Sequence, residues 1–369
     1  MSFLTRRRLI AVAGSVGIST VAGCIGDSGS ASGSNPDDGT DTAVDTDRDG
    51  QTGPPTADRR LPEDYTIEEL NDNARSGGPP PDGIPSIDDP NFLPADESPR
   101  NLVDESPVFG VEINGDARAY PQYVLVWHEI VNDVVGGEPV AVTYCPLTGT
   151  AQGFYRGETT FGVSGQLINT NLVMFDRATD SYWPQILARG ITAPHEGEYL
   201  DEFHVIWTTW KRWRTAHPDT QVLSEDTGFA RNYGSDPYGD YLPPSGYYSN
   251  ENTLFPPLQT NDRFPLKQVV IGTRSEDGAM AITKEQLRKD TVIGGSINGV
   301  AYDSVYEPEL DTGYVYRNPD SLDVVTDGNR YTVGGEPYDP DDLPLERQIA
   351  FDAMWLAWYG YYPSTVVLE

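Results

Sequence analysis

Short apolar runs, separated by glycine and proline, constrain this chain more than any other feature of its sequence. The 369 residues include 37 glycines and 30 prolines, which interrupt regular structure or place it in turns. The runs between them are rich in β-branched and aromatic residues, which favour strands bounded by turns. The runs that we interpret as strands are 108–113, 140–144, 159–163, 269–273 and 300–306. The chain is therefore expected to build its core mainly from short strands.

Helical patterns are fewer. In the segment 207–217, Trp210, Trp213 and His217 recur at helical spacing on one face. The segments that we expect to be helical are 65–73, 207–217, 283–288 and 349–359. Strands and helices together predict a mixed, β-dominated α+β fold.

Several short motifs recur in the same order in two parts of the chain. The series that contains Gly136-Gly137 and Tyr155-Arg156 parallels a later series with Gly294-Gly295 and Tyr316-Arg317. A degenerate internal duplication would produce this recurrence and would give two related β-rich halves. Chance similarity among glycine- and tyrosine-rich turns would produce it as well, so both interpretations stay open.

The N-terminal residues have the pattern of an export signal. Arg6 and Arg7 fit a twin-arginine motif, and the uncharged stretch that follows is shorter than the roughly 20 residues that cross a membrane. The stretch ends in the lipobox VAGC, whose cysteine is Cys24. We therefore expect residues 1–23 to be a signal peptide and Cys24 to carry a lipid. The protein would then be a lipoprotein, anchored on the outer, extracellular face of the cytoplasmic membrane; the alternative is a secreted protein with an incidental cysteine.

The charge is strongly acidic. With 57 acidic and 25 basic residues, the formal net charge is −32, and the chain has only four lysines. An acidic, lysine-poor surface is typical of a halophilic protein, which must stay soluble where the Debye length is only about 3 Å at 1 M salt. An acidic surface that binds cations is the alternative. Nucleic acid is excluded as a partner, because no basic patch is available to neutralise phosphates.

A polar segment separates the N-terminus from the part of the chain that can fold. Residues 26–58 contain no aromatic side chain and one branched aliphatic, Val44, so they bury too little apolar surface to become ordered. We expect residues 24–60 to form an acidic linker and residues 61–369 to form the folded domain. With Cys24 acylated, Cys145 is the sole remaining thiol, and no intramolecular disulfide can form.

The region between residues 117 and 155 is the strongest candidate for a reactive or ligand-binding site. A short apolar segment leads to Trp127-His128-Glu129, and Asp133 follows before the next strand. That strand ends in Cys145-Pro146, a position that is more exposed to a cleft than mid-strand. We predict that His128 and Cys145 approach each other there, with Glu129 and Asp133 nearby.

The same region carries a resemblance to a known family. The runs WHEIVND, GGEPVAVTYCPLTGTA and FGVSGQLINTNLVMFDRATDSYW resemble the domain-of-unknown-function 3179 family, and so do WKRWRTAHPDTQVLSEDT, DPYGDY and FDAMWLAWYGYYP. The resemblance covers most of residues 100–369 and implies no activity, because the family has none established. Its members commonly carry Cys-Pro-Leu-Cys-Gly at the loop that begins with Cys145. Thr148 replaces the second cysteine here, which excludes two-cysteine redox chemistry at this loop.

Three interpretations of His128 and Cys145 compete. They could bind a metal such as copper, zinc or iron, completed by Glu129, Asp133 or the more distant His204. Alternatively, His128 could lower the thiol pKa, so that Cys145 acts as a nucleophile. In the third interpretation both are ordinary core residues.

A binding or accessory role, with a metal or cofactor site near His128 and Cys145, is the leading functional prediction. A thiol-dependent enzyme and a purely structural surface protein are the alternatives. The membrane, reached through the lipid anchor, is the one partner that the sequence predicts. It identifies no cofactor, metal, protein partner or small-molecule partner. If Cys145 is enclosed by apolar side chains and His128 points elsewhere, attention moves to the loop at 236–241.

Overall fold

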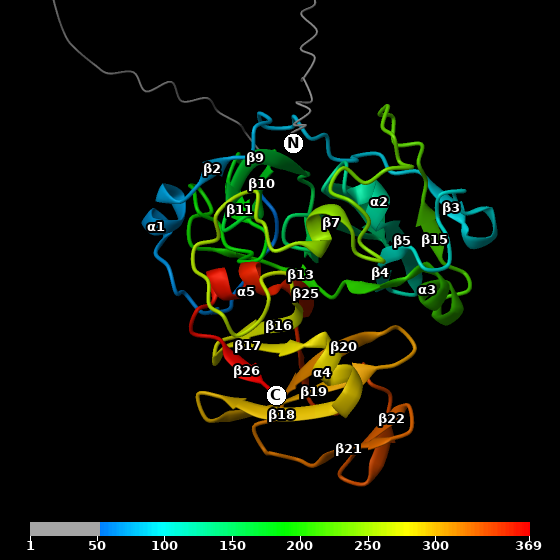
Figure 1. Ribbon diagram of the computed structural model, residues 1–369, viewed down its shortest axis with the longest axis vertical. Helices are drawn as coiled ribbons and strands as arrows, with labels where there is room; N and C mark the ends of the chain where they lie inside the picture. Colours follow the sequence, from blue (N-terminus) through cyan, green and yellow to red (C-terminus); the bar gives the residue numbers. More distant parts are fainter. Residues whose placement is uncertain (1–51) are drawn as a thin grey trace, which may run out of the picture. The chain divides into compact units, whose positions relative to one another are not determined.

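Strands are the main elements of the protein, and Figure 1 shows them arranged in layers with a few short helices. The structure is a computed structural model that describes residues 52–369. The expected β-dominated α+β fold is confirmed. Arg6, Arg7 and Cys24, with the predicted signal peptide and lipid anchor, lie outside the described residues. Within residues 52–369, no helix combines the length and the apolar character needed to cross a membrane.

The first half of the fold, strands β1 to β15, contains a mixed sheet, two four-stranded antiparallel sheets and a two-stranded antiparallel sheet. The mixed sheet has the order β14(Ile206–Thr209), β4(Pro107–Ile113), β5(Asp116–Pro121), β15(Gln221–Leu223), β3(Phe92–Pro94). The second sheet has the order β13(Glu202–Phe203), β8(Thr150–Tyr155), β7(Glu138–Cys145), β6(Ile130–Val135). The third has the order β11(Tyr182–Pro184), β10(Asn171–Asp176), β9(Phe161–Ile168), β2(Arg75–Ser76). Consecutive strands are mostly hydrogen-bonded neighbours, as expected of short connections.

The second half, strands β16 to β26, repeats part of this plan. Its mixed sheet has the order β25(Ala350–Met354), β16(Val269–Ser275), β17(Gly278–Thr283), β26(Val366–Leu368). An antiparallel sheet follows in the order β18(Val292–Ile297), β19(Val300–Glu307), β20(Thr312–Arg317), β24(Glu346–Gln348). The strands β21(Val324–Asp327), β22(Arg330–Val333) and β23(Glu336–Tyr338) form a small outer sheet.

The mixed sheets of the two halves share one topology. In each, an antiparallel hairpin is flanked by an antiparallel strand that leads into a helix and by a parallel strand that follows that helix. The helices, α3(Trp210–Ala216) and α5(Trp355–Tyr361), each press a tryptophan against a glycine: Trp213 covers Gly110, and Trp358 covers Gly272. Shared topology is what the predicted internal duplication would produce. Duplication itself stays a prediction.

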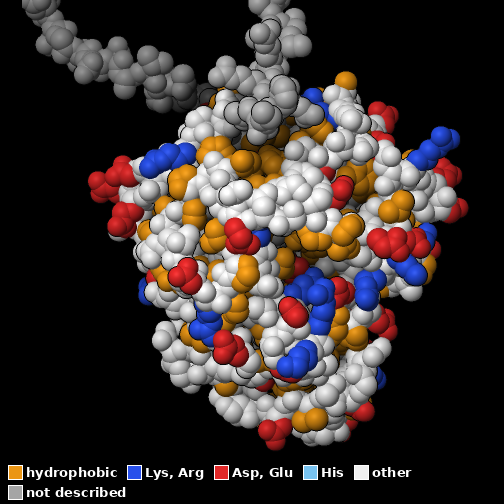
Figure 2. Space-filling view, viewed as in Figure 1, with side chains coloured by type: hydrophobic (Ala, Val, Ile, Leu, Met, Phe, Trp, Pro, Cys, Tyr) orange, Lys and Arg blue, Asp and Glu red, His pale blue; other side chains and the backbone are white. Residues whose placement is uncertain are grey.

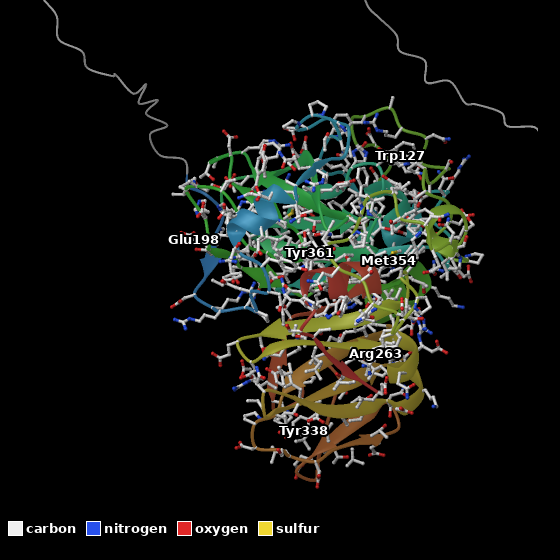
Figure 3. All side chains as sticks on the ribbon, turned by 60° about the vertical axis from the view of Figure 1, so that its left-hand side comes forward. Trp127, Glu198, Arg263, Tyr338, Met354 and Tyr361 are labelled. Carbon is white, nitrogen blue, oxygen red and sulfur yellow. The ribbon has the colours of Figure 1, made fainter. Side chains whose placement is uncertain are left out.

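The mixed sheet of the second half lies between two cores. Ala279 and Ala281 on β17 face the core that contains Leu172 of the first half, whereas Met280 and Ile282 face the core of the second half. This alternation follows from the period of two along a strand. Figure 3 shows Met354 and Tyr361, from β25 and α5, between Trp127 of the first half and Tyr338 of the second.

The helices begin where local capping and strand pairing allow. Helix α1(Ile67–Asp72) starts at a capping box formed by Thr66 and Glu69, and α4(Lys284–Asp290) starts at Thr283, whose side chain accepts a hydrogen bond from the Gln286 amide. Helix α2(Gln122–Leu125) is a single turn. Two predicted helices are shorter than expected, because residues 206–209 and 350–354 pair as strands with β4 and β16. Strand pairing overrides the helical spacing there.

The fold begins before the predicted boundary at Leu61. Strand β1(Thr56–Ala57) pairs with β12(Tyr199–Leu200), and the Arg59 side chain forms an ion pair with Glu202. Residues 56–60, which composition assigns to the linker, therefore belong to the domain. Backbone pairing and one ion pair fix this segment, and neither depends on apolar content.

Candidate functional site

His128 lies just after α2 and is fully buried. Its Nδ1 is 2.8 Å from the Pro85 carbonyl oxygen and must donate to it, because a carbonyl only accepts. In the neutral ring, Nε2 then accepts from the Tyr233 hydroxyl at 2.6 Å, and Tyr233 in turn contacts the Thr227 hydroxyl at 2.6 Å. Burial lowers the pKa of His128, which favours this neutral form. Both ring nitrogens are therefore occupied by protein partners.

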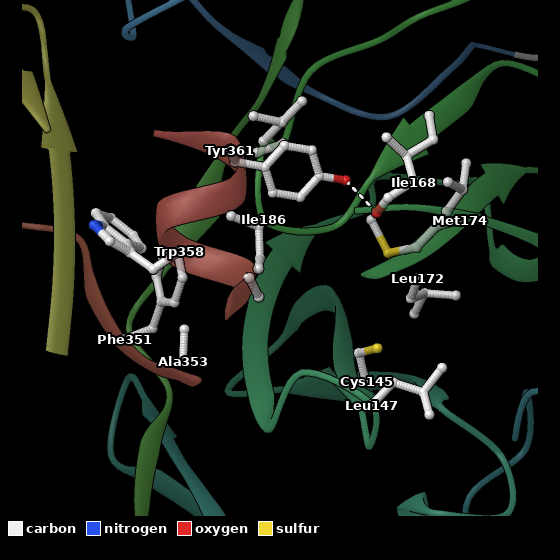
Figure 4. Close-up of a cluster of buried hydrophobic side chains, with 14 of the residues drawn as sticks. Cys145, Leu147, Ile168, Leu172, Met174, Ile186, Phe351, Ala353, Trp358 and Tyr361 are labelled. Atoms are coloured by element: carbon white, nitrogen blue, oxygen red, sulfur yellow. Dashed lines mark hydrogen bonds between the residues drawn. The ribbon is translucent and has the colours of Figure 1, made fainter. Parts of the chain in front are cut away.

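Cys145 ends β7 and points into the core. Figure 4 shows it among Leu147, Leu172 and Met174, and it is 1% exposed. Its Sγ donates a long, weak hydrogen bond to the Thr170 carbonyl oxygen at 3.9 Å. Burial, and to a lesser degree the charge of Glu129, raises the pKa of Cys145 to about 11. The thiol thus stays protonated at neutral pH, which is the opposite of an activated nucleophile.

The structure does not bring His128 and Cys145 together. No hydrogen bond joins them, and within residues 52–369 no group of three or more His, Cys, Asp or Glu side chains is placed to hold a metal. His204 is also separate from His128: its ring packs on Tyr314 at a centroid distance of 5.2 Å, and burial lowers its pKa to about 3.

Glu129 is the acidic neighbour of Cys145. It is 8% exposed and has a φ of 60°, a conformation that non-glycine residues adopt rarely. Its amide donates to the Leu125 carbonyl, and its carbonyl accepts from the Tyr144 amide, both at 2.7 Å. Burial raises the pKa of Glu129 to about 8. Among the predicted site residues, Glu129 is thus the one whose charge acts on Cys145.

Asp133 has a structural partner. On β6, its carboxylate accepts a hydrogen bond of 2.7 Å from the Tyr120 hydroxyl. Burial raises the pKa of Asp133, and the hydrogen bond from Tyr120 opposes this effect. The arrangement fixes β6 to β5.

The loop at 236–241 docks on α2 and forms the wall of a pocket. Asp236 accepts hydrogen bonds from Gln122 Nε2 at 3.0 Å and from the Tyr248 hydroxyl at 3.4 Å. Farther along the loop, the ring of Tyr241 packs on Trp207, with centroids 4.8 Å apart and planes 34° apart. A polar contact thus anchors the loop, and an aromatic pair faces the pocket.

The pocket lies at the junction of the two halves and has a volume of about 570 Å³. Figure 2 shows basic side chains gathered in a hollow near α4. The pocket is lined by Pro107, Trp207, Thr208, Thr209, Tyr241, Leu242, Lys267, Gln268, Val269, Lys284, Glu285, Arg288, Asp311 and Asp352. Its size falls in the range of about 300–1,000 Å³ that is usual for small-molecule sites.

Two of the three cations in the pocket have carboxylate partners. Lys284 Nζ is 2.7 Å from Asp352 Oδ2, and Arg288 binds Asp311 through Nε at 2.7 Å and Nη2 at 2.6 Å. The bidentate pair fixes the guanidinium, and the lysine pair is largely buried.

Lys267 is the third cation, and its partners are uncharged. Its Nζ donates to the carbonyl oxygens of Tyr247 and Asn252, the latter at 2.8 Å, and lies 3.4 Å from the centre of the Tyr247 ring. In the part of the chain that the structure describes, no carboxylate lies within ion-pair distance of it. Burial lowers the pKa of Lys267, and the charge of Glu251 opposes this effect.

A comparison with known families assigns the chain. The family described as "Protein of unknown function (DUF3179)" matches residues 81–365. The chain belongs to the DUF3179 family. No curated protein and no solved structure matches it. The matched range of the DUF3179 domain includes every residue that lines the pocket. The family description states no activity, so function has to be argued from the pocket.

Sequence reasoning missed this DUF3179 pocket, although one signal was present. The chain has four lysines: Lys211, Lys267, Lys284 and Lys289. Two of the four line the same pocket. In a chain where acidic residues outnumber basic ones 57 to 25 and lysine is rare, two lysines in one pocket are unusual.

Proposed function

We propose that this DUF3179 protein is an exported, lipid-anchored binding protein that holds a small acidic ligand in the junction pocket. The observation that carries the proposal is Lys267, a partly buried cation in the pocket without a carboxylate partner. A buried charge is costly unless it is paired, and a ligand carboxylate or phosphate would pair with it. Lysine suits such groups as a compact point charge.

The rest of the pocket favours a ligand with a flat or apolar part. Trp207 and Tyr241 form an aromatic wall, and aromatic rings offer a large surface for stacking. Arg288 and Lys284 add positive potential to the same pocket, where Asp311 and Asp352 partly balance it. The ligand class that fits is a small carboxylic or phosphoric acid that carries a ring.

Location outside the cytoplasm is part of the same proposal. It rests on the twin-arginine motif at Arg6 and Arg7 and on the lipobox that ends at Cys24. Changing both arginines to lysine should leave the precursor in the cytoplasm, and Cys24→Ser should release a soluble form. Retention of the Cys24→Ser protein on membranes after a high-salt wash would contradict the lipid anchor.

The predicted site at His128 and Cys145 receives less support than the pocket. A metal would have to displace Tyr233 from His128 Nε2, and Cys145 faces a different core. A thiol-dependent enzyme would need a reactive thiolate, whereas burial raises the pKa of Cys145 to about 11. Binding is therefore the role that we propose, without a thiol-dependent reaction.

Ligand binding can be tested with defined acids and uncharged counterparts. The probes are benzoate, glucuronate and phenyl phosphate, compared with benzamide, glucose and phenol, respectively, by thermal shift and calorimetry. At least one acid should bind, and its uncharged counterpart should not. Lys267→Gln should weaken binding about tenfold or more, because a charge-assisted hydrogen bond contributes about 1.5–3 kcal/mol.

The matched control is Lys289→Gln, which removes an exposed lysine that does not line the pocket. It should bind like the natural protein. If no acid in the panel binds, or if the two lysine variants bind alike, the proposed function is wrong.

A further inference from the structure

A second cluster of buried charges lies where β16 of the second half meets β8 and β13 of the first. We name it the joint cluster, and its members are Arg59, Gln152, Glu202, Arg274 and Tyr362. Glu202 and Arg274 are each 1% exposed at the side chain, and Arg59 is 25% exposed. None of these residues lines the junction pocket.

The joint cluster has more positive than negative charge. Glu202 Oε1 accepts from Arg274 Nη2 at 2.9 Å and from Gln152 Nε2 at 3.0 Å, and its other oxygen contacts Arg59. Among residues 52–369, neither guanidinium forms an ion pair with any other carboxylate. Two guanidinium groups thus share one carboxylate, and the cluster carries an excess of one positive charge.

The N–H groups of Arg274 are also incompletely paired. Its Nε and Nη1 are buried and form no close hydrogen bond among the described residues, and the same holds for Arg59 Nε. The Tyr362 hydroxyl interacts with the Arg274 guanidinium, but one hydroxyl cannot satisfy both of these N–H groups. The ring of Phe351 lies 5.1 Å from Arg274 Cζ, but a ring covers only the face of a guanidinium and leaves its edge. Buried polar groups are almost always satisfied, and an exception points to a water or an ion.

We propose that the joint cluster binds a small monovalent anion, chloride in the first instance, at the unpartnered N–H groups of Arg274. An anion both accepts these hydrogen bonds and neutralises the excess charge, whereas a water molecule does only the first. Because the surrounding side chains are buried, the site suits a monatomic ion better than a larger acid. The ion would connect the second half to the first through Arg274.

Anion binding predicts a stabilisation that depends on the ion and not on ionic strength alone. Thermal and urea unfolding of the full mature chain should be compared in sodium chloride and sodium gluconate at equal ionic strength. Above the dissociation constant, a tenfold rise in chloride should raise the ratio of folded to unfolded protein up to tenfold. Gluconate should not produce this increment.

Bromide shows directly where the anion binds. Crystals grown in sodium bromide should show an anomalous peak in contact with the guanidinium of Arg274. This measurement needs no variant, so it decides the question even if changes in the cluster prevent folding. Equal stabilisation by chloride and gluconate, with no bromide peak at Arg274, would overturn the proposal in favour of a bound water.

A pair of variants assigns the effect to the cluster. Arg274→Met removes the excess charge and the unpartnered donors while Glu202 keeps Arg59, so the chloride-specific increment should disappear. Arg330→Met is the control, because it removes an exposed arginine that pairs with Asp339 at 3.0 Å. That variant should keep the increment, and its loss there would contradict the assignment.

Discussion

Lys284 Nζ lies 2.7 Å from Asp352 Oδ2, and this ion pair joins the first residue of α4 to strand β25. The corresponding helix of the first half, α2, also begins with a buried polar residue, Gln122, whose amide donates to Asp236 at 3.0 Å. In both halves, the helix that follows the hairpin is thus tied through its first side chain to an aspartate elsewhere in the chain. In the second half, this tie lines the junction pocket.

The Lys284–Asp352 pair should be important for stability, because only 10% and 8% of the two side chains are exposed. Lys284→Met leaves the Asp352 carboxylate buried without its partner, and breaking a buried pair costs about 3–5 kcal/mol. Urea unfolding should show a loss of that size. Adding Asp352→Leu should recover most of it, and Lys289→Met should change stability by less than about 0.5 kcal/mol. A single variant as stable as the double variant would argue against this role.

Local sequence predicted the strands well where β-branched residues are concentrated. The range 140–144 lies within β7, and 300–306 lies within β19. Prediction failed where the spacing of apolar residues fits both a helix and a strand. Ile206, Trp207, Trp210 and Trp213 satisfy a helical face, yet the first two pair with β4 as part of β14. The competing partner is distant in sequence, so no local pattern reveals it.

Cys145 should be unreactive in the folded protein. Burial raises the pKa of its thiol to about 11, and 1% of the residue is exposed. Iodoacetamide at pH 8 should leave Cys145 unmodified, as measured by mass spectrometry of the Cys24→Ser form, which has no other cysteine. The same reagent in concentrated urea should modify it fully. Rapid modification under native conditions would restore the thiol-dependent enzyme as a candidate.

The site itself was harder to predict than the fold. The motif around His128 and Cys145 drew attention because its residue types are reactive, but reactivity depends on exposure and partners, which the sequence does not give. The pocket assembles Trp207, Lys267, Lys284 and Asp352, which lie up to 145 positions apart in the chain. The scarcity of lysine was the one signal in the sequence, and it gains meaning only because Lys267 and Lys284 line the same pocket.

The raised pKa of Glu129 should make the folded state less stable as the pH rises. Burial raises its pKa from 4.5 to about 8 in the folded protein. Between these values the folded state holds a proton that the unfolded state has released, so this contribution to stability is full below pH 4.5 and is lost as the pH rises through 8. The free energy of unfolding changes through this group by at most about 1.4 kcal/mol per pH unit.

Glu129→Gln removes this titration, so the stability difference between the variant and the natural protein should grow in the variant's favour from pH 5 to pH 8. Urea unfolding at several pH values measures it. Parallel curves for the two proteins would contradict a raised pKa of Glu129.

The contacts between tryptophan and glycine test whether the same packing stabilises both halves of the protein. A Cβ atom at Gly110 would lie 2.2 Å from the Trp213 ring, and one at Gly272 would lie 2.3 Å from the Trp358 ring. Overpacking of a tight core costs about 1–3 kcal/mol, so Gly110→Ala and Gly272→Ala should each lower the free energy of unfolding by that amount.

Gly234→Ala is the matched control, because the nearest atom to its Cβ would be Asn232 Oδ1 at 3.5 Å, an ordinary contact. It should have little effect. The indole nitrogens strengthen the comparison: Trp213 Nε1 donates to the Thr220 hydroxyl at 2.9 Å, and Trp358 Nε1 donates to the Thr365 hydroxyl at 3.0 Å. The two alanine variants should therefore shift tryptophan fluorescence and stability alike. A large effect in one half and none in the other would show that the shared topology does not extend to shared energetics.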